Sequence, residues 1–319
     1  MKEYVIAIEI GGSKLQIALG TSDGRICNLK RGEVSPDEEN KGILAWLNRN
    51  LPEFISSINT SEEAILGIGV GFGGPVNSNE GLIIKSMQIE GWDGFPLKKW
   101  IEDNFSLPCF LYNDSNAAGY GEYSLGRGKK ESPFFYINIG SGIGGCLIIE
   151  DDLFDGQGYG AGEIGHFRIP DWMDDTAGSD CELEDLCSGW SIEARLRKDG
   201  YVPAGSVLSD MCGGDFGKIN CKMLGDAANQ NDEFALNELD RISNSIGIAL
   251  TNVLCLFSPV TIAVGGGVSL IGEVLLEKIR FHTKKRDLIN YTGHYKIVPC
   301  ELGETVVING VVLLTHKEI

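Results

Sequence analysis

The feature that most constrains the fold is a pattern that occurs twice along the chain. A short apolar strand runs into a glycine-rich turn and then into a second strand. Ile8-Glu9-Ile10-Gly11-Gly12-Ser13 near the N-terminus matches Ile137-Asn138-Ile139-Gly140-Ser141-Gly142 near the middle. Glycine turns at strand ends let backbone amides approach phosphate oxygens, because no side chain intervenes. The repetition predicts a duplicated lobe with a phosphate-sized turn in each half.

A third glycine turn, Gly265-Gly266-Gly267, follows the apolar run 260–264. Neither the lysine-bearing phosphate loop nor the dinucleotide fingerprint with its acidic partner is present. One glycine turn alone is more often a tight hairpin. Three such turns, two of them in matching contexts, favour phosphate binding.

Apolar periodicity predicts helices over about 38–58, 232–257 and 270–282, and buried strands between them. Alternation of strands and helices is typical of the α/β class. The opening strands, 5–10 and 13–19, are separated by a two-glycine turn and predict a meander. With 319 residues, the chain is expected to form two lobes.

The formal net charge is −18, which disfavours nucleic acid and anionic membranes as partners. A nucleotide could still be held by backbone amides and a metal ion.

The nine cysteines are odd in number and scattered, several of them in apolar runs, which is typical of free thiols in a reducing compartment. No signal peptide and no apolar run of about 20 residues is evident, so a cytoplasmic location is expected.

Two further segments carry polar residues suited to chemistry. In Leu111-Tyr112-Asn113-Asp114-Ser115-Asn116, a strand is predicted to deliver Asp114 to the start of a helix, where the helix dipole favours an ionised carboxylate. Such a carboxylate can accept a hydroxyl proton during phosphoryl transfer, although an aspartate there is usually only an N-cap. In Gly162-Glu163-Ile164-Gly165-His166, a carboxylate and an imidazole are both suited to sugar hydroxyls.

Taken together and in order, these segments resemble the ROK family of sugar kinases and related repressors over nearly the whole chain. The resemblance implies a two-lobed actin-like, ribonuclease-H-like ATPase fold with duplicated mixed-sheet lobes. It implies a smaller lobe of residues 1–113 plus about 300–319, and a larger lobe of residues 114–299. It also implies ATP with Mg²⁺ as cofactor, a hexose as substrate and a homodimer as assembly.

The same resemblance implies roles for individual residues. Asp114 is the expected general base. The expected sugar ligands are Asn113, Glu163, His166 and Glu184, with Gln88 where the family often has a sugar-contacting asparagine. The expected ATP-binding residues are Glu9, Gly11, Gly12, Ser13, Lys14, Gly140, Ser141, Gly142, Gly144, Gly265, Gly266 and Gly267.

The sequence departs from the family at two places. Glu9 stands where the family usually has aspartate. The family also commonly places a Cys-x-Cys pair and a third cysteine after its histidine, whereas here Cys181 alone remains within that stretch. His166 with one thiol is too small a ligand set for a closed structural zinc site, which needs four, so no structural zinc is expected.

We therefore expect an ATP-dependent hexose kinase acting at the 6-position. Glucose is the commonest family substrate; fructose, mannose, allose and N-acetylmannosamine are alternatives. A catalytically weak sugar sensor of the same fold is a second hypothesis, motivated by Glu9 and the missing cysteines. A DNA-binding repressor is disfavoured by the net charge of −18 and by a first strand that begins by residue 4.

Overall fold

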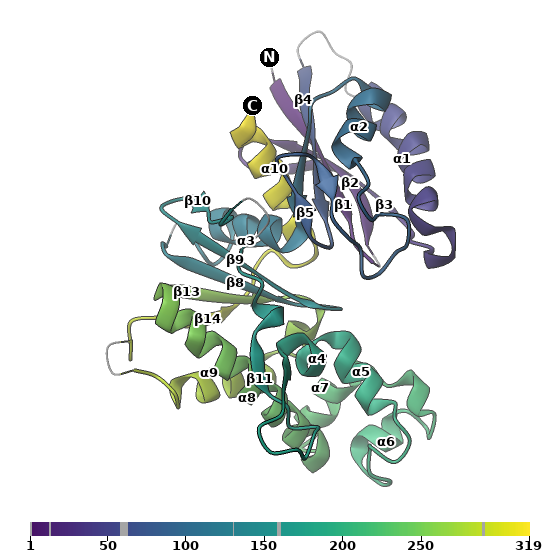
Figure 1. Cartoon of the computed structure of the whole chain (residues 1–319). Helices are drawn as coiled ribbons and strands as arrows, with labels where there is room; N and C mark the ends of the chain where they lie inside the picture. Colours follow the sequence, from purple (N-terminus) through teal and green to yellow (C-terminus); the bar gives the residue numbers. More distant parts are fainter. Residues whose placement is uncertain (1, 13, 58–62, 130, 158–160, 289–290) are drawn as a thin grey trace. The chain divides into compact units, whose positions relative to one another are not determined.

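The computed structural model describes residues 2–12, 14–57, 63–129, 131–157, 161–288 and 291–319 (Figure 1). It confirms the α/β class and contains two five-stranded mixed sheets. The chain divides into two compact units. The first comprises Met1–Lys130, Cys146–Ala161 and Leu302–Ile319, and the second comprises Glu131–Gly145 and Gly162–Glu301.

The first sheet has the strand order β3-β2-β1-β4-β7. The pairs β1–β2 and β2–β3 are antiparallel, which confirms the opening meander, while β4 is parallel to both β1 and β7. The bounds are β1 Lys2–Ile10, β2 Leu15–Thr21, β3 Ile26–Gly32, β4 Glu63–Phe72 and β7 Cys109–Asn113.

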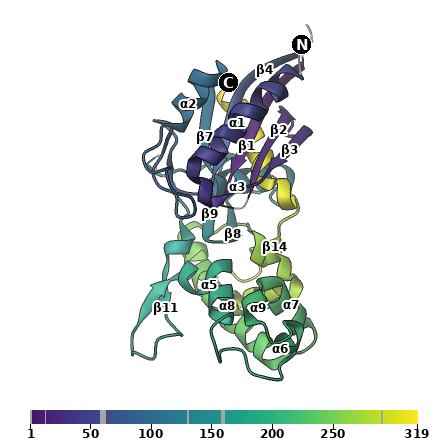
Figure 2. The ribbon, with the colours of Figure 1, turned by 90° about the vertical axis from the view of Figure 1, so that its right-hand side faces the viewer.

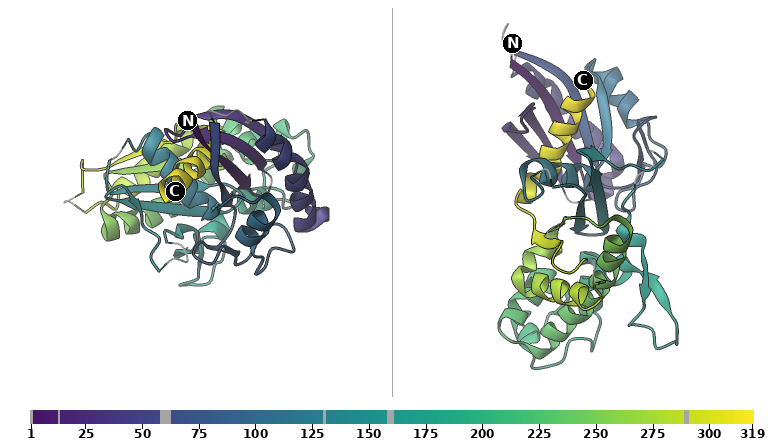
Figure 3. Two further views of the ribbon diagram at one scale, coloured as in Figure 1. Left: turned by 90° about the horizontal axis from the view of Figure 1, so that it is seen from above. Right: turned by 90° about the vertical axis from the view of Figure 1, so that its left-hand side faces the viewer.

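Side chains of β1 alternate between two apolar layers, as the period of two in a strand requires. Ile6 and Ile8 pack in a core with α1 (Glu39–Ser56) and α2 (Leu97–Phe105). Val5 and Ala7 pack in a second core with α3 (Asp114–Leu125) and α10 (Val306–Glu318). The C-terminal helix thus lies against the N-terminal strand, as Figure 3 shows.

The second sheet has the order β10-β9-β8-β13-β14. The central strand β13 is parallel to both β8 and β14, and β10 forms an antiparallel hairpin with β9. The bounds are β8 Phe134–Ile139, β9 Ile143–Ile149, β10 Asp152–Leu153, β13 Thr261–Gly265 and β14 Lys296–Pro299. The first three residues of β9 belong to the second unit, as do β8, β13 and β14.

The longest helix of the second unit is α8 (Glu233–Phe257), which lies along α9 (Glu273–Lys284) (Figures 1 and 2). Asp232 caps α8 by accepting a 2.8 Å hydrogen bond from the backbone N–H of Ala235. The helix ends before Ser258, which is left-handed, and Pro259. The predicted bounds of α8 are therefore confirmed to within one residue.

The helix expected from about residue 270 begins later than predicted. A 3₁₀ turn, Gly267–Ile271, comes first, and Gly272 with a φ of 90° separates it from α9. Apolar residues at Val268 and Ile271 continue the pattern across this break, because both face the core.

The remaining elements of the second unit are short. A hairpin of β11 (Arg168–Pro170) and β12 (Asp180–Glu182) leads directly into α4 (Leu183–Cys187) and α5 (Gly189–Leu196). The helices α6 (Val207–Met211) and α7 (Cys221–Asn229) follow. Within the described ranges, no helix has both the length and the apolar character that a membrane span requires.

Candidate functional site

Three loops of the first unit meet at one edge of its sheet. The strands β1, β4 and β7 are parallel, and their registers pair Ile10 with Phe72 and Phe72 with Asn113. The chain therefore leaves all three strands at the same carboxyl edge, where ligands of α/β sheets commonly bind. A 2.8 Å hydrogen bond from the Gly73 N–H to the Ile10 carbonyl joins two of the loops.

Asn113, not Asp114, caps helix α3. The Asn113 side-chain oxygen accepts hydrogen bonds from the N–H groups of Ser115 (2.9 Å) and Asn116 (3.0 Å). The Asn113 amide nitrogen donates to the carbonyl of Gly74 at 3.1 Å, so both ends of this side chain are held within the first unit. Asp114 is therefore not the N-cap of α3, the role that an aspartate at this position usually has.

The Asp114 carboxylate lies in the first turn of α3 and is partly buried. The Ser115 hydroxyl donates to its Oδ1 at 3.3 Å. Its Oδ2 lies close to Gly73, where an added Cβ would be 3.3 Å away. A carboxylate at a helix N-terminus, beside a glycine that leaves room, is well placed to accept a proton.

Glu9 is a buried acid at the same edge, with only 5% of its surface exposed. Burial raises its pKa to about 7, and the negative charge of Asp114 adds to that effect. The hydrogen bond from the Gln16 side chain and the positive charge of Lys14 act in the opposite direction.

The first glycine turn is closed by a 2.8 Å hydrogen bond from the Gly11 N–H to the Lys14 carbonyl. Gln88 lies directly over Gly12, since an added Cβ there would be 1.6 Å from the Gln88 Oε1. Gln88 and the glycine turn therefore contact each other, although they are far apart in sequence. Ser13 lies outside the described residues.

The second unit brings two other glycine turns together. The parallel strands β8 and β13 pair Asn138 with Gly265, so the turns that follow them, 140–142 and 265–267, share one edge. Gly266 has a φ of 84°, and an added Cβ would be 2.4 Å from the Ile139 carbonyl oxygen. Gly267 faces open space, because no heavy atom of the described part of the chain comes within 4 Å of an added Cβ.

The turn after β8 also touches the start of α5. Gly140 closes it by donating from its N–H to the Gly142 carbonyl at 2.9 Å. The carbonyls of Gly140 and Ser141 accept from the N–H groups of Gly189 (2.7 Å) and Trp190 (3.4 Å). Gly144 lies within β9 and is partly buried.

Glu184 and His166 come together in the second unit, within a group of three side chains. Ligand atoms of His166, Glu182 and Glu184 lie within 4.8 Å of one another. The Glu184 Oε2 accepts from the Ile143 N–H at 3.2 Å. His166 Nδ1 lies 2.7 Å from the Glu182 carboxylate, and this hydrogen bond is the main cause of a raised His166 pKa.

Glu163 stands immediately before the 3₁₀ turn Ile164–His166. Loss of surrounding water raises its pKa, with a further contribution from Glu184, while His166 acts in the opposite direction. This segment thus holds three carboxylates and one imidazole, whose acceptors and donors suit polyol hydroxyls.

Glu182 was not among the site residues expected from the sequence. The signal available was the acidic run Cys181-Glu182-Leu183-Glu184, in which Glu182 and Glu184 are two residues apart. The run spans the end of β12 and the beginning of α4, and this local geometry turns both carboxylates towards His166.

Comparison with known proteins shows what the chain is similar to. The model of the ROK family matches residues 5–318. A glucokinase of Halalkalibacterium halodurans is 30% identical over 88% of this chain and 84% of its own. A putative xylose repressor of a Caldicellulosiruptor strain is 27% identical over 98% of this chain and 78% of its own.

A solved structure agrees with these matches. The ROK family glucokinase of Streptomyces griseus, in complex with glucose and AMPPNP, is 27% identical, with a TM-score of 0.81 over 98% of each chain.

Proposed function

This chain belongs to the ROK family, and on that premise we propose that it is an ATP-dependent kinase of a hexose, acting at the 6-hydroxyl. Glucose is the sugar we put first, because the similar curated and solved proteins include glucokinases, one of them in complex with glucose and AMPPNP. Fructose, mannose, allose and N-acetylmannosamine remain the alternative acceptors.

The observation that carries the proposal is the placement of Asp114. It lies at the carboxyl ends of the parallel strands β4 and β7, in the first turn of a helix that another residue caps. In the proposed reaction the sugar hydroxyl donates its proton to Asp114 as its oxygen attacks the γ-phosphorus of ATP, and ADP leaves. Phosphoryl transfer needs positioning and charge neutralisation more than covalent help, so one oriented base suffices.

The glycine turns supply the proposed nucleotide contacts. Open space at Gly267 and the absence of side chains at Gly11 and Gly140 suit close approach of phosphate oxygens to backbone amides. Glu9 would hold Mg²⁺ or its waters, and its buried carboxylate fits that role because a nearby cation favours its ionised form. When bound, Mg²⁺ neutralises charge on the phosphates. The proposed sugar ligands are Asn113, Glu163, His166, Glu184 and Gln88.

The test replaces Asp114 with asparagine, which keeps the shape and removes the base. We expect Asp114→Asn to lower kcat by a factor on the order of 10² or more, with little change in the KM for sugar. The matched control is Asp103→Asn, the same change on the exposed face of α2, where the side chain pairs with Lys99. Near wild-type turnover in Asp114→Asn would contradict the role of base.

A sugar sensor of the same fold is the second candidate, because Glu9 replaces the family's usual aspartate and a relative is named as a repressor. ATP consumption measured across a panel of hexoses and N-acetylhexosamines separates the two. A kinase turns over at least one sugar, whereas a sensor binds a sugar, seen by calorimetry, without consuming ATP.

A further inference from the structure

The hairpin that follows His166 is where the family resemblance implies a zinc ion held by that histidine and three cysteines. The donor set here does not fit that ion. Between His166 and Glu184 the chain carries one cysteine, Cys181, whereas a closed structural zinc site takes four ligands. Among the described residues, the group of converging ligand atoms at this place consists of His166, Glu182 and Glu184, and no thiol joins it.

Glu182 contacts the Nδ1 atom of the His166 ring, one of the two ring atoms that could bind a metal. Its Oε2 lies 2.7 Å from His166 Nδ1, so the ring donates its Nδ1 proton to the carboxylate. A histidine bound in this way by a carboxylate keeps one tautomer and one ring orientation. Nε2 is then the ring atom left to meet a ligand hydroxyl.

Glu182 is itself held in place by local structure. It pairs with Arg168 in the register of the β11–β12 hairpin. It is also the N-cap residue of α4 in a capping box, in which its N–H donates to the Asp185 carboxylate at 3.0 Å. Glu182 is therefore both the last residue of β12 and the N-cap of α4. These two roles limit the movement of its carboxylate.

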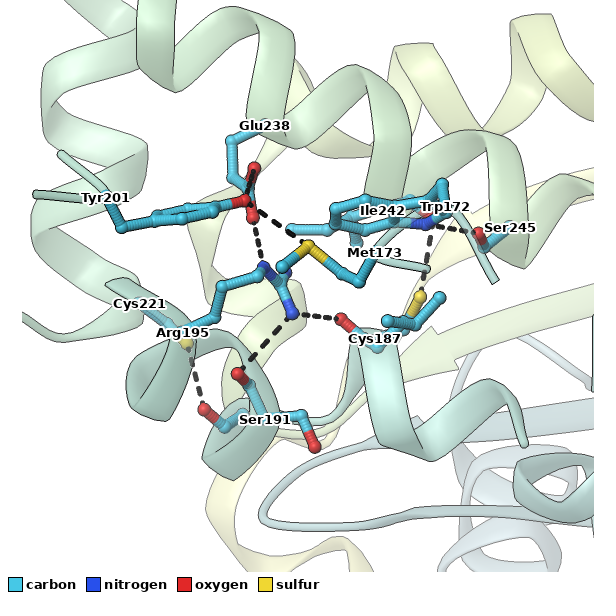
Figure 4. Close-up of polar contacts among 12 residues, drawn as sticks. Trp172, Met173, Cys187, Ser191, Arg195, Tyr201, Cys221, Glu238, Ile242 and Ser245 are labelled. Carbon is cyan, nitrogen blue, oxygen red and sulfur yellow. Dashed lines mark hydrogen bonds and ion pairs between the residues drawn. The ribbon is translucent and has the colours of Figure 1, made fainter. Parts of the chain in front are cut away.

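Side-chain contacts also hold the loop of the hairpin against α5 and α8. Trp172 donates from Nε1 to the Ser245 hydroxyl at 3.1 Å, and the Arg195 guanidinium lies 4.8 Å from the centre of its ring (Figure 4). Arg195 in turn pairs with Glu238 at 2.7 Å, and both side chains are buried. Trp172 thus joins the hairpin to α5 and α8.

We propose that Glu182 takes the place of a structural metal in this chain: it is a positioning residue that orients the His166 imidazole for contact with the sugar. The part that concerns the sugar rests on the proposed function. The hydrogen bond between Glu182 and His166 is testable without it.

The test compares two replacements of Glu182. Alanine removes the acceptor, whereas glutamine keeps an oxygen that can accept the Nδ1 proton. We expect Glu182→Ala to raise the KM for sugar about tenfold, as the loss of one oriented hydrogen bond predicts, with kcat within about twofold. Glu182→Gln should restore most of the lost affinity. An unchanged KM in Glu182→Ala would overturn the proposal.

Asp185→Ala is the matched control, because it disrupts the same capping box without touching His166. We expect its KM for sugar to stay near that of the wild type. An increase equal to that of Glu182→Ala would mean that helix capping, not orientation of the ring, is responsible, and would also overturn the proposal.

Nitrogen-15 NMR of the His166 ring supplies a readout independent of activity. At a pH above the titration of the ring, the wild type and Asp185→Ala should carry the proton on Nδ1, and Glu182→Ala should shift it towards Nε2. A wild-type proton on Nε2, or near-stoichiometric metal bound at His166 after dialysis, would overturn the proposal. Absence of turnover with every sugar, with the Nδ1 proton present, would instead count against the proposed function alone.

Discussion

At the scale of single residues, the decisive features are two carboxylates at one sheet edge with different surroundings. Asp114 is partly buried at a helix N-terminus, where the dipole favours its ionised form. Glu9 is almost fully buried on β1, which raises its pKa to about 7. The two carboxylates therefore have different surroundings at the same edge.

The raised pKa of Glu9 predicts a pH dependence of stability. The folded chain holds the Glu9 proton up to about pH 7, whereas the unfolded chain releases it near 4.5. The free energy of unfolding therefore falls as pH rises between these values. Glu9→Gln should flatten this fall and unfold at higher urea than the wild type at pH 8, by up to about 3 kcal/mol. Urea unfolding at pH 5 and about pH 8 measures it.

The matched control for Glu9 is Glu90→Gln, the same change at an exposed position. It should leave the pH dependence of unfolding as in the wild type. A Glu9→Gln variant with the same pH dependence of unfolding as the wild type would show that the Glu9 pKa does not change on folding.

At the scale of elements, α5 and α8 are joined by a buried ion pair. Arg195 and Glu238 have 4% and 2% of their side chains exposed, and the Tyr201 hydroxyl donates to the second Glu238 oxygen at 2.9 Å (Figure 4). Removing one partner of such a pair leaves a buried charge without compensation.

Arg195→Met should therefore lower the free energy of unfolding by about 3–5 kcal/mol. The double variant Arg195→Met, Glu238→Leu should lose less than the single one. As a control, Lys99→Met removes an exposed i,i+4 partner of Asp103 and should cost under about 1 kcal/mol. Calorimetric or denaturant unfolding compares the three, and equal losses in Arg195→Met and Lys99→Met would refute the role of the pair.

The turn after β13 gives a second prediction at this scale. Gly266→Ala places a Cβ 2.4 Å from the Ile139 carbonyl in a backbone with φ of 84°, so we expect a loss of about 2 kcal/mol or more. Gly267→Ala, one residue on, meets open space and should leave the melting temperature nearly unchanged. Thermal unfolding of both variants decides whether the strained turn is required.

At the scale of the whole molecule, the net charge of −18 bears on which kind of ROK protein this is, since the family's relatives include both kinases and repressors. Binding to DNA depends on cationic contacts with phosphates. We predict no binding of a labelled DNA duplex at physiological salt, with or without glucose or xylose, measured by fluorescence anisotropy beside a known DNA-binding protein. Saturable binding that depends on the DNA sequence would contradict this.

The sequence by itself determined the class of fold and most of the elements, because apolar periodicity and glycine turns are local signals. The stripe of α8, with its cap at Asp232 and its end before Pro259, was predictable to within a residue. The break at Gly272 was not, because apolar residues continue on both sides of it.

Only the tertiary structure decided which side chains meet. It assigned the cap of α3 to Asn113 and laid Gln88 over Gly12. It paired His166 with Glu182 across a hairpin, and Arg195 of α5 with Glu238 of α8, 43 residues further along the chain. Spacing along the chain cannot specify such contacts, because they depend on how separate elements pack, whereas the periodicity that predicts strands and helices is a property of neighbouring residues.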